Sequence, residues 1–340
     1  MFTGGRFVLM LAPSQWQVSW TMVKRWLPWL IKGGVSALAI WWVMRKVDFA
    51  GAWSQAKAIE PWTLLVATLL MLVQIMLGAV RWGMVLRALG GHFSAIRTAA
   101  VYYMGVFFTL VTTMGGDAMR MWFSRRGGLS LTAAVNSVML ERGVTVLGLV
   151  VLVVITEPLL LARAPDIPGA WVFPALLVVC IVGILVLSVL DRLPAALSRW
   201  RLVRGLGHLA GDTRTLFFTP SWSIGTLTVA VIGHVNLAVS LWVLAKGLGL
   251  PVGLIDCLVL FPPVILITTL PISIGGLGVR ETAMATVFGF IGVAHDSAVL
   301  LSLVFFATSV ATALPGGLVF LLSAEYRTPP EVLDVEKAEA

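Results

Sequence analysis

The chain has 340 residues, of which 59% are hydrophobic and only 12% are charged, with a formal net charge of +8. Because soluble domains carry about 25% charged residues, this composition excludes an ordinary soluble domain and predicts an all-α polytopic membrane protein. Two cysteines in apolar runs and four scattered histidines predict no disulfide framework, no metal site and no bound cofactor.

The first segment, residues 1–26, lacks an apolar region followed by a small-residue cleavage site, so we expect an uncleaved cytoplasmic or interfacial segment. Residues 27–323 then form a single transmembrane domain. A membrane-spanning helix needs about 20 apolar residues. That length predicts six spans near 27–44, 62–80, 131–155, 171–190, 221–245 and 297–323. Tryptophans such as Trp82 flank these runs, which is typical of aromatic belts at the membrane surface.

Between the spans we expect loops, among them residues 191–214 with five arginines. Residues 324–340 form an acidic tail that contains Pro-Pro and is predicted to be mobile. No nucleic-acid partner is expected from the basic residues, because short loops rich in Lys and Arg are how membrane proteins set their orientation.

Two further apolar runs, about 97–114 and 253–272, end at glycine breaks. They continue as TLVTTMGGDAMRMW (109–122) and TTLPISIGGLGVRETA (268–283). Lipid tolerates non-helical backbone only where it is buried in protein or lines a wet cavity. Two such breaks at corresponding positions of the two halves indicate a transporter-type binding site.

The distribution of Lys and Arg favours re-entrant hairpins at both breaks. If every apolar run crosses the membrane, the N-terminal side holds 10 Lys and Arg and the opposite side 12, against the positive-inside rule. If both broken runs return to the side from which they entered, the N-terminal side holds 16 Lys and Arg and the opposite side 6. This distribution places both termini in the cytoplasm. Residues 62–155 and 221–323 then form two copies of opposite orientation, an inverted repeat.

In the second motif, Arg280 and Glu281 lie near the start of a new helix, whose free N–H groups attract anions. An arginine can also bind phosphate through two parallel hydrogen bonds. The alternative is structural, with Arg280 paired to a carboxylate that holds the hairpin together. The hydroxyls can satisfy freed backbone groups or face a ligand. The expected substrate-binding residues here are Arg280, Gly275, Gly276, Ser273 and Thr269.

In the first motif, Gly115, Gly116 and Arg120 are the expected substrate-binding residues. Asp117 can cap the following helix and pair with Arg120 three residues later, or it can contact substrate.

An ion-pair or coupling network is expected from Asp117, Glu141, Arg142 and Glu281. Glu141 could pair with Arg280 or Arg120, and Arg142 with Asp117 or Glu281. His234 and Asn236, inside an apolar span, are weaker candidates, because such groups more often form helix–helix hydrogen bonds.

The stretch LPISIGGLGVRE (270–281), and GGDAMR (115–120) followed about twenty residues later by ER (141–142), resemble the lysylphosphatidylglycerol synthase transmembrane-region family. These proteins are also called flippase-like or UPF0104 proteins. The resemblance covers about residues 25–323. It implies the lipid-translocating half of such proteins, and we expect no room for the soluble synthase domain.

The sequence therefore predicts an integral protein of the bacterial inner membrane that moves an anionic phospholipid or polyprenyl-type lipid between leaflets. No hydrolytic or nucleotide-binding motif is visible, so no enzyme activity is expected. Two alternatives stay open: a membrane-embedded enzyme acting on a lipid headgroup, and a non-transporting lipid-binding subunit for a separate lipid synthase.

Overall fold

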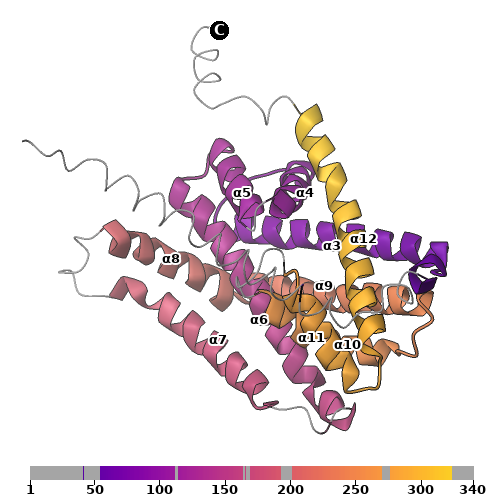
Figure 1. The fold of residues 1–340 in the computed structure, drawn as a ribbon. Helices are drawn as coiled ribbons and strands as arrows, with labels where there is room; N and C mark the ends of the chain where they lie inside the picture. Colours follow the sequence, from indigo (N-terminus) through magenta and orange to yellow (C-terminus); the bar gives the residue numbers. More distant parts are fainter. Residues whose placement is uncertain are drawn as a thin grey trace, which may run out of the picture.

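The computed structural model describes residues 54–111, 114–163, 169–192, 201–269 and 276–323, with residues 41 and 165 in isolation. Within these ranges every regular element is helical, as the composition predicts (Figure 1). The helices are α3 (Pro61–Ala88), α4 (Ala95–Val111), α5 (Gly115–Arg126), α6 (Leu131–Arg163), α7 (Val172–Ser188), η1 (Leu190–Arg192), α8 (Arg201–Phe218), α9 (Pro220–Gly247), α10 (Leu254–Thr269), α11 (Val279–Gly289) and α12 (His295–Leu322).

Four of these helices, α3, α6, α9 and α12, are long and apolar enough to cross a membrane. They contain the predicted spans 62–80, 131–155 and 221–245, and the span 297–323 except for its last residue. The predicted span 171–190 corresponds to α7, an apolar helix of 17 residues with many exposed aliphatic side chains. The predicted span 27–44 lies outside the described residues except for Trp41, as do the segment 1–26 and the tail 324–340.

The segment that we expected to be an arginine-rich loop is in large part helix α8. Leu209, Thr213 and Leu216 recur at helical spacing and are buried, so one face of α8 packs onto the bundle. Helix α8 contacts α6, α7 and α9. The prediction of a loop over 191–214 was therefore wrong. The arginines suggested a loop, but the residues between them recur at helical spacing and form a buried helix face.

Both glycine breaks interrupt a helix as predicted. Helix α4 is followed by α5 and helix α10 by α11, and each pair of helices packs together. With 12 and 11 residues, α5 and α11 are about 18 and 16 Å long, too short to cross the roughly 30 Å hydrocarbon core. Gly276 and Gly278 have φ values of +76° and +80°, which only glycine adopts easily.

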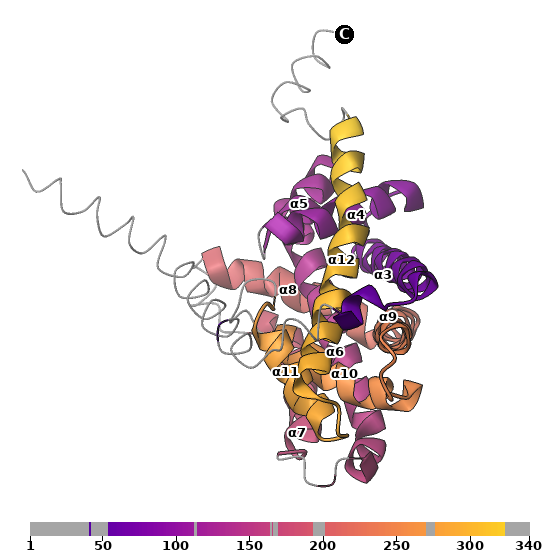
Figure 2. The same ribbon diagram turned by 45° about the vertical axis from the view of Figure 1, so that its right-hand side comes forward.

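Helices α3 and α9 lie side by side as an antiparallel pair (Figures 1 and 2). The N–H of Glu60, before α3, donates to the carbonyl of Gly247 at the end of α9 over 3.3 Å. At the opposite end, a Cβ on Gly225 would lie 2.5 Å from Met84 Cε. Each helix has 28 residues and begins with proline, which suits the first helical position.

Helices α6 and α12 each link the two halves of the chain. Helix α6 contacts α5 near its start and α10 near its end, where Arg163 pairs with Asp256. Helix α12 contacts α11 near its start and α4 near its end, where Tyr103 Oη donates to the Thr312 carbonyl over 2.8 Å. Figure 2 shows α12 running from α11 up to α4. The same set of contacts therefore occurs twice, with the halves exchanged.

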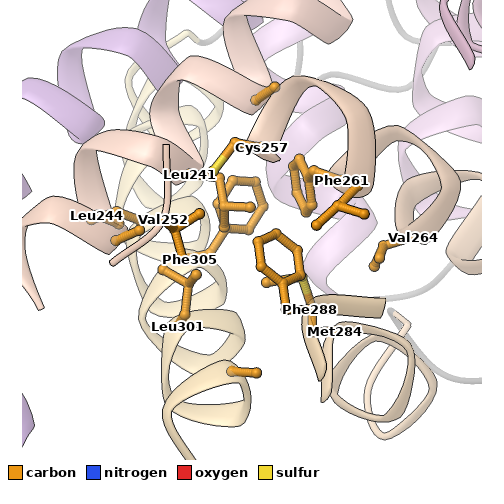
Figure 3. Close-up of a cluster of buried hydrophobic side chains, with 14 of the residues drawn as sticks. Leu241, Leu244, Val252, Cys257, Phe261, Val264, Met284, Phe288, Leu301 and Phe305 are labelled. Atoms are coloured by element: carbon orange, nitrogen blue, oxygen red, sulfur yellow. The ribbon is translucent and has the colours of Figure 1, made fainter. Parts of the chain in front are cut away.

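The largest buried cluster lies among α9, α10, α11 and α12, and Figure 3 shows its side chains converging. Phe261 and Phe305 meet edge to face with ring centroids 5.0 Å apart. Aromatic pairs of this geometry add about 0.5–1.5 kcal/mol beyond the burial of their area. The cluster holds the second interrupted helix against the bundle.

Helix α5 lies against α4 at a glycine contact. A Cβ on Gly116 would lie 2.2 Å from both the Gly105 carbonyl oxygen and Thr109 Oγ1. Gly116→Ala is therefore expected to destabilise the fold by about 1–3 kcal/mol through overpacking. Thermal unfolding in detergent measures the effect. Gly183→Ala in α7, where no atom lies within 4 Å of the added Cβ, should be neutral or stabilising. Equal melting temperatures for wild type and Gly116→Ala would contradict this packing.

Candidate functional site

The carboxylate of Glu141, on α6, is buried and joins three helices. Its Oε1 accepts hydrogen bonds from Arg81 Nε at 3.0 Å and Arg81 Nη2 at 2.5 Å, on α3. Its Oε2 accepts one from Arg120 Nη1 on α5 at 3.0 Å. A buried carboxylate is tolerable only when paired and hydrogen-bonded. Both arginines are also buried, so this bridge fixes α3, α5 and α6 relative to one another.

The bridge continues from Arg120 to the surface of the described chain. Arg120 Nη2 donates to Asp117 Oδ1. Asp117 also accepts hydrogen bonds from Arg142, with Nη2 to Oδ1 at 2.9 Å and Nε to Oδ2 at 3.2 Å. The result is a continuous chain of five ionised side chains, which we call the first ion-pair chain. Its members in order are Arg81, Glu141, Arg120, Asp117 and Arg142.

Two aromatic rings cover the Arg120 guanidinium. Its Cζ lies 5.2 Å from the ring centroid of Tyr102 and 5.7 Å from that of Trp82, distances at which a cation is attracted to the ring face. Trp82 is only 2% exposed. The interpretation of Trp82 as an interfacial anchor was therefore wrong: it is a core residue next to the charged network.

The second motif forms a smaller cluster at the start of α11. Glu281 Oε2 accepts the N–H of Gly278 at 2.6 Å, so this carboxylate occupies the helix N-terminus where we expected an external anion. Glu281 Oε1 accepts hydrogen bonds from Arg280 Nη2 at 2.8 Å and Ser302 Oγ at 2.9 Å. Arg280 Nε donates to Ser302 Oγ at 3.0 Å, and its Cζ lies 4.8 Å from the Phe306 ring centroid.

These contacts decide between several expected pairings. Glu141 pairs with Arg120, and Arg142 pairs with Asp117, which confirms two of the predicted alternatives. The other two, Glu141 with Arg280 and Arg142 with Glu281, do not occur among the described residues. The sequence places Arg280 and Glu281 next to each other, and the side chains of neighbouring residues on a helix ordinarily point in different directions. They nevertheless pair, because Ser302 on α12 draws both side chains to one point.

The expected capping of α5 by Asp117 is not observed, because the helix begins two residues earlier, at Gly115, and Asp117 lies in its first turn. Gly116 is used for close packing against α4. Thr269 Oγ1 donates to the Leu266 carbonyl over 2.6 Å, so this hydroxyl satisfies a backbone group as foreseen. Ser273 and Gly275 lie outside the described residues.

The two weaker candidates join helices. His234 Nε2 lies 3.0 Å from the Thr145 carbonyl oxygen on α6. Asn236 Nδ2 donates to the Leu70 carbonyl at 2.9 Å and to Gln74 Oε1 at 3.3 Å, both on α3. These are helix–helix hydrogen bonds of the kind common in membrane bundles.

Arg81 was not among the predicted site residues. We ended the second span at residue 80 and counted Arg81 as a loop charge, whereas α3 continues to Ala88 and buries this side chain. One signal could have revealed it. Arg81, Val85 and Ala88 continue the helical spacing of the apolar face, so the helix has no reason to stop at the charge.

Two hollows adjoin helices α3 and α4. A pocket of about 190 Å³ is bounded by α3, α4, α9 and α12, with polar groups from Gln74, Tyr102, Ser309 and Thr312. A groove of about 390 Å³ between α3 and α4 is lined mainly by apolar side chains such as Val80 and Ile96. Tyr102 borders the pocket and also lies against Arg120, so it separates the pocket from the buried guanidinium.

Glu141→Gln is expected to lower the free energy of unfolding by about 3–5 kcal/mol, because it leaves two buried guanidiniums without their shared carboxylate. Thermal or denaturant unfolding in detergent measures this. Glu157→Gln is the matched control on the same helix, since Glu157 forms no ion pair within the described chain. Equal stability of Glu141→Gln and Glu157→Gln would mean that the bridge does not stabilise the fold.

Comparison with known proteins agrees with this structure. The sequence matches the family described as lysylphosphatidylglycerol synthase TM region over residues 29–317. A search of curated proteins found no match. The matched range covers most of the chain, including both glycine breaks, three of the four long apolar helices and all but the last five residues of the fourth, α12. The protein is thus an integral membrane protein that belongs to the lysylphosphatidylglycerol synthase TM region family.

Proposed function

We propose that this protein moves a lipid with an anionic headgroup, a phospholipid or a polyprenyl-type lipid, between the leaflets of the bacterial inner membrane. The observation that carries the proposal is the first ion-pair chain, whose members Arg81, Glu141 and Arg120 are buried among the helices while Asp117 and Arg142 lead to the surface. Ionised groups at membrane depth are costly, and they mark substrate or ion pathways by default. Family membership supports a role connected with lipids.

The arrangement of the helices supports an inverted repeat. The antiparallel pair of α3 and α9, and the exchanged contacts of α6 and α12, are what two units of opposite orientation produce. In this proposal α4–α5 is a re-entrant hairpin entered from the cytoplasm, α10–α11 is one entered from outside, and both termini are cytoplasmic. Binding sites of such transporters lie where the two repeats meet. The pocket bounded by α3, α4, α9 and α12 lies between the two units.

The proposed headgroup contacts are the interrupted helices. A lipid phosphate would compete with Asp117 for Arg120 and with Glu281 for Arg280, because each arginine already forms a charge-assisted pair that a phosphate can replace. The glycines Gly115, Gly275 and Gly276 would let a headgroup approach the backbone, whereas Gly116 is occupied by its contact with α4. The acyl chains would lie in the apolar groove between α3 and α4, which is open to the outside of the bundle.

The carboxylates give the network a means of coupling to a gradient. Protonation of Asp117 would release Arg142 and one side of Arg120, so a proton and a lipid phosphate could exchange places there. In this proposal, Glu141 and Glu281 keep their arginines aligned. A separately encoded lipid synthase would supply the substrate.

Reconstitution in liposomes with labelled anionic and zwitterionic phospholipids tests the proposal. We expect headgroup-dependent movement by the wild-type protein, with and without a proton gradient. Arg280→Lys keeps the charge but loses the fork of the guanidinium, so we expect a roughly tenfold slower movement, as for the loss of one charge-assisted hydrogen bond.

Because Arg280 is buried, its variants need a test of folding. Arg280→Gln with Glu281→Gln removes the whole pair and leaves no unpaired charge, so this double variant should fold and still fail to move lipid. Full movement by the folded double variant would contradict a role for Arg280 in binding phosphate. No movement by folded wild-type protein under any gradient would favour the lipid-binding subunit or the enzyme instead.

A further inference from the structure

We infer that Arg142, at the outer end of the first ion-pair chain, is the first contact for a phosphodiester that carries one net negative charge. This inference rests on the proposed function, since it takes the ligand to be the headgroup of the transported lipid. It assigns to Arg142 a direct contact with the ligand, beyond its pairing with Asp117. It also states the charge of the group that the site selects.

The charge balance of the first ion-pair chain calls for one further anion. Its members contribute three guanidiniums and only two carboxylates. Glu141 is shared between Arg81 and Arg120, and Asp117 between Arg120 and Arg142. One positive charge is therefore in excess, and a group with a single negative charge would neutralise it.

The excess charge is accessible at Arg142. The Arg142 side chain is 52% exposed and its partner Asp117 21%, whereas Arg81, Arg120 and Glu141 are almost completely buried. A ligand arriving from outside the described chain can thus reach Arg142 without breaking the inner bridge. Open space adjoins this position, because a Cβ added to Gly143 would have no atom within 4 Å.

The location of Arg142 favours a lipid as the source of the anion. Arg142 lies about 16 Å along α6 from Leu131, within a helix whose composition suits the membrane interior. Exposed Met139 precedes it by one helical turn. A half-exposed guanidinium in such surroundings is costly unless it meets water or an anionic group. A phospholipid supplies the phosphodiester and the apolar contacts together.

The cluster of Arg280, Glu281 and Ser302 differs from the first ion-pair chain in its charge balance. Arg280 and Glu281 balance each other, Ser302 completes their hydrogen bonds, and all three side chains are buried. That cluster needs no additional anion. The two interrupted helices therefore differ in charge as well as in sequence, and the first one offers the entry contact.

Native mass spectrometry of the full-length protein in detergent, with phosphatidylglycerol and phosphatidylcholine as probes, tests this inference. We expect wild type to retain phosphatidylglycerol, with one net negative charge, in preference to zwitterionic phosphatidylcholine. Arg142→Gln should lower that preference roughly tenfold, the change expected for the loss of a contact to a charged group. Asp117→Asn, which removes a competing carboxylate from Arg142, should increase the retention of phosphatidylglycerol.

The matched control is Arg214→Gln. Arg214 is 42% exposed and forms a two-bond pair with Asp191 outside the first ion-pair chain, so its loss should leave the preference unchanged. An unchanged preference in Arg142→Gln, or an equal loss in Arg214→Gln, would overturn the inference. Displacement of phosphatidylglycerol by inorganic phosphate at a similar concentration would overturn the assignment to a lipid.

The same variants separate this inference from the proposed function. If wild type binds phosphatidylglycerol through Arg142 but moves no lipid in liposomes, the proposed transport fails and the Arg142 site remains. If wild type moves lipid and Arg142→Gln moves it with the same headgroup selectivity, the transport remains and the Arg142 site fails.

Discussion

The buried carboxylate of Glu141 is the constraint on which the first half of the structure depends. Three helices meet at this group because two buried guanidiniums, from α3 and α5, need the same counter-charge. Once they meet there, the positions of Trp82 and Tyr102 follow, since both rings cover Arg120. Helix α5 is then fixed on one side by this bridge and on the other by the contact of Gly116 with Gly105 on α4.

Much of this arrangement could be predicted from the sequence. Hydrophobic run length located the long helices, and the glycine pairs located the interruptions, because both properties depend on the local chain alone. The pairs Glu141–Arg120 and Asp117–Arg142 were among the predicted alternatives, since few opposite charges exist in these apolar segments. Which alternative forms depends on helix packing, and sequence spacing does not determine that.

The errors arose where a charge interrupts an apolar pattern. Arg81 ended the predicted second span, and the arginines of residues 191–214 concealed the buried face of α8. In both helices a charged side chain finds a partner, since Arg214 of α8 pairs with Asp191. Arg81 reaches Glu141 from sixty residues away. Glu281, three residues after the N-cap Gly278, accepts the N–H of Gly278 with its own carboxylate. The N-terminus of α11, which we expected to bind an external anion, is therefore already occupied.

The course of α12 has a mechanical consequence. This helix holds α11 through Ser302 near its start and α4 through Thr312 near its end, and it contacts α3 and α9 as well. A rigid rod that pivots about its middle moves its two ends in opposite directions. Tilting α12 about its middle would therefore move α11 inward and α4 outward, or the reverse. Helix α6 connects α5 to α10 in the opposite direction, so the two interrupted helices would be linked by two opposed levers.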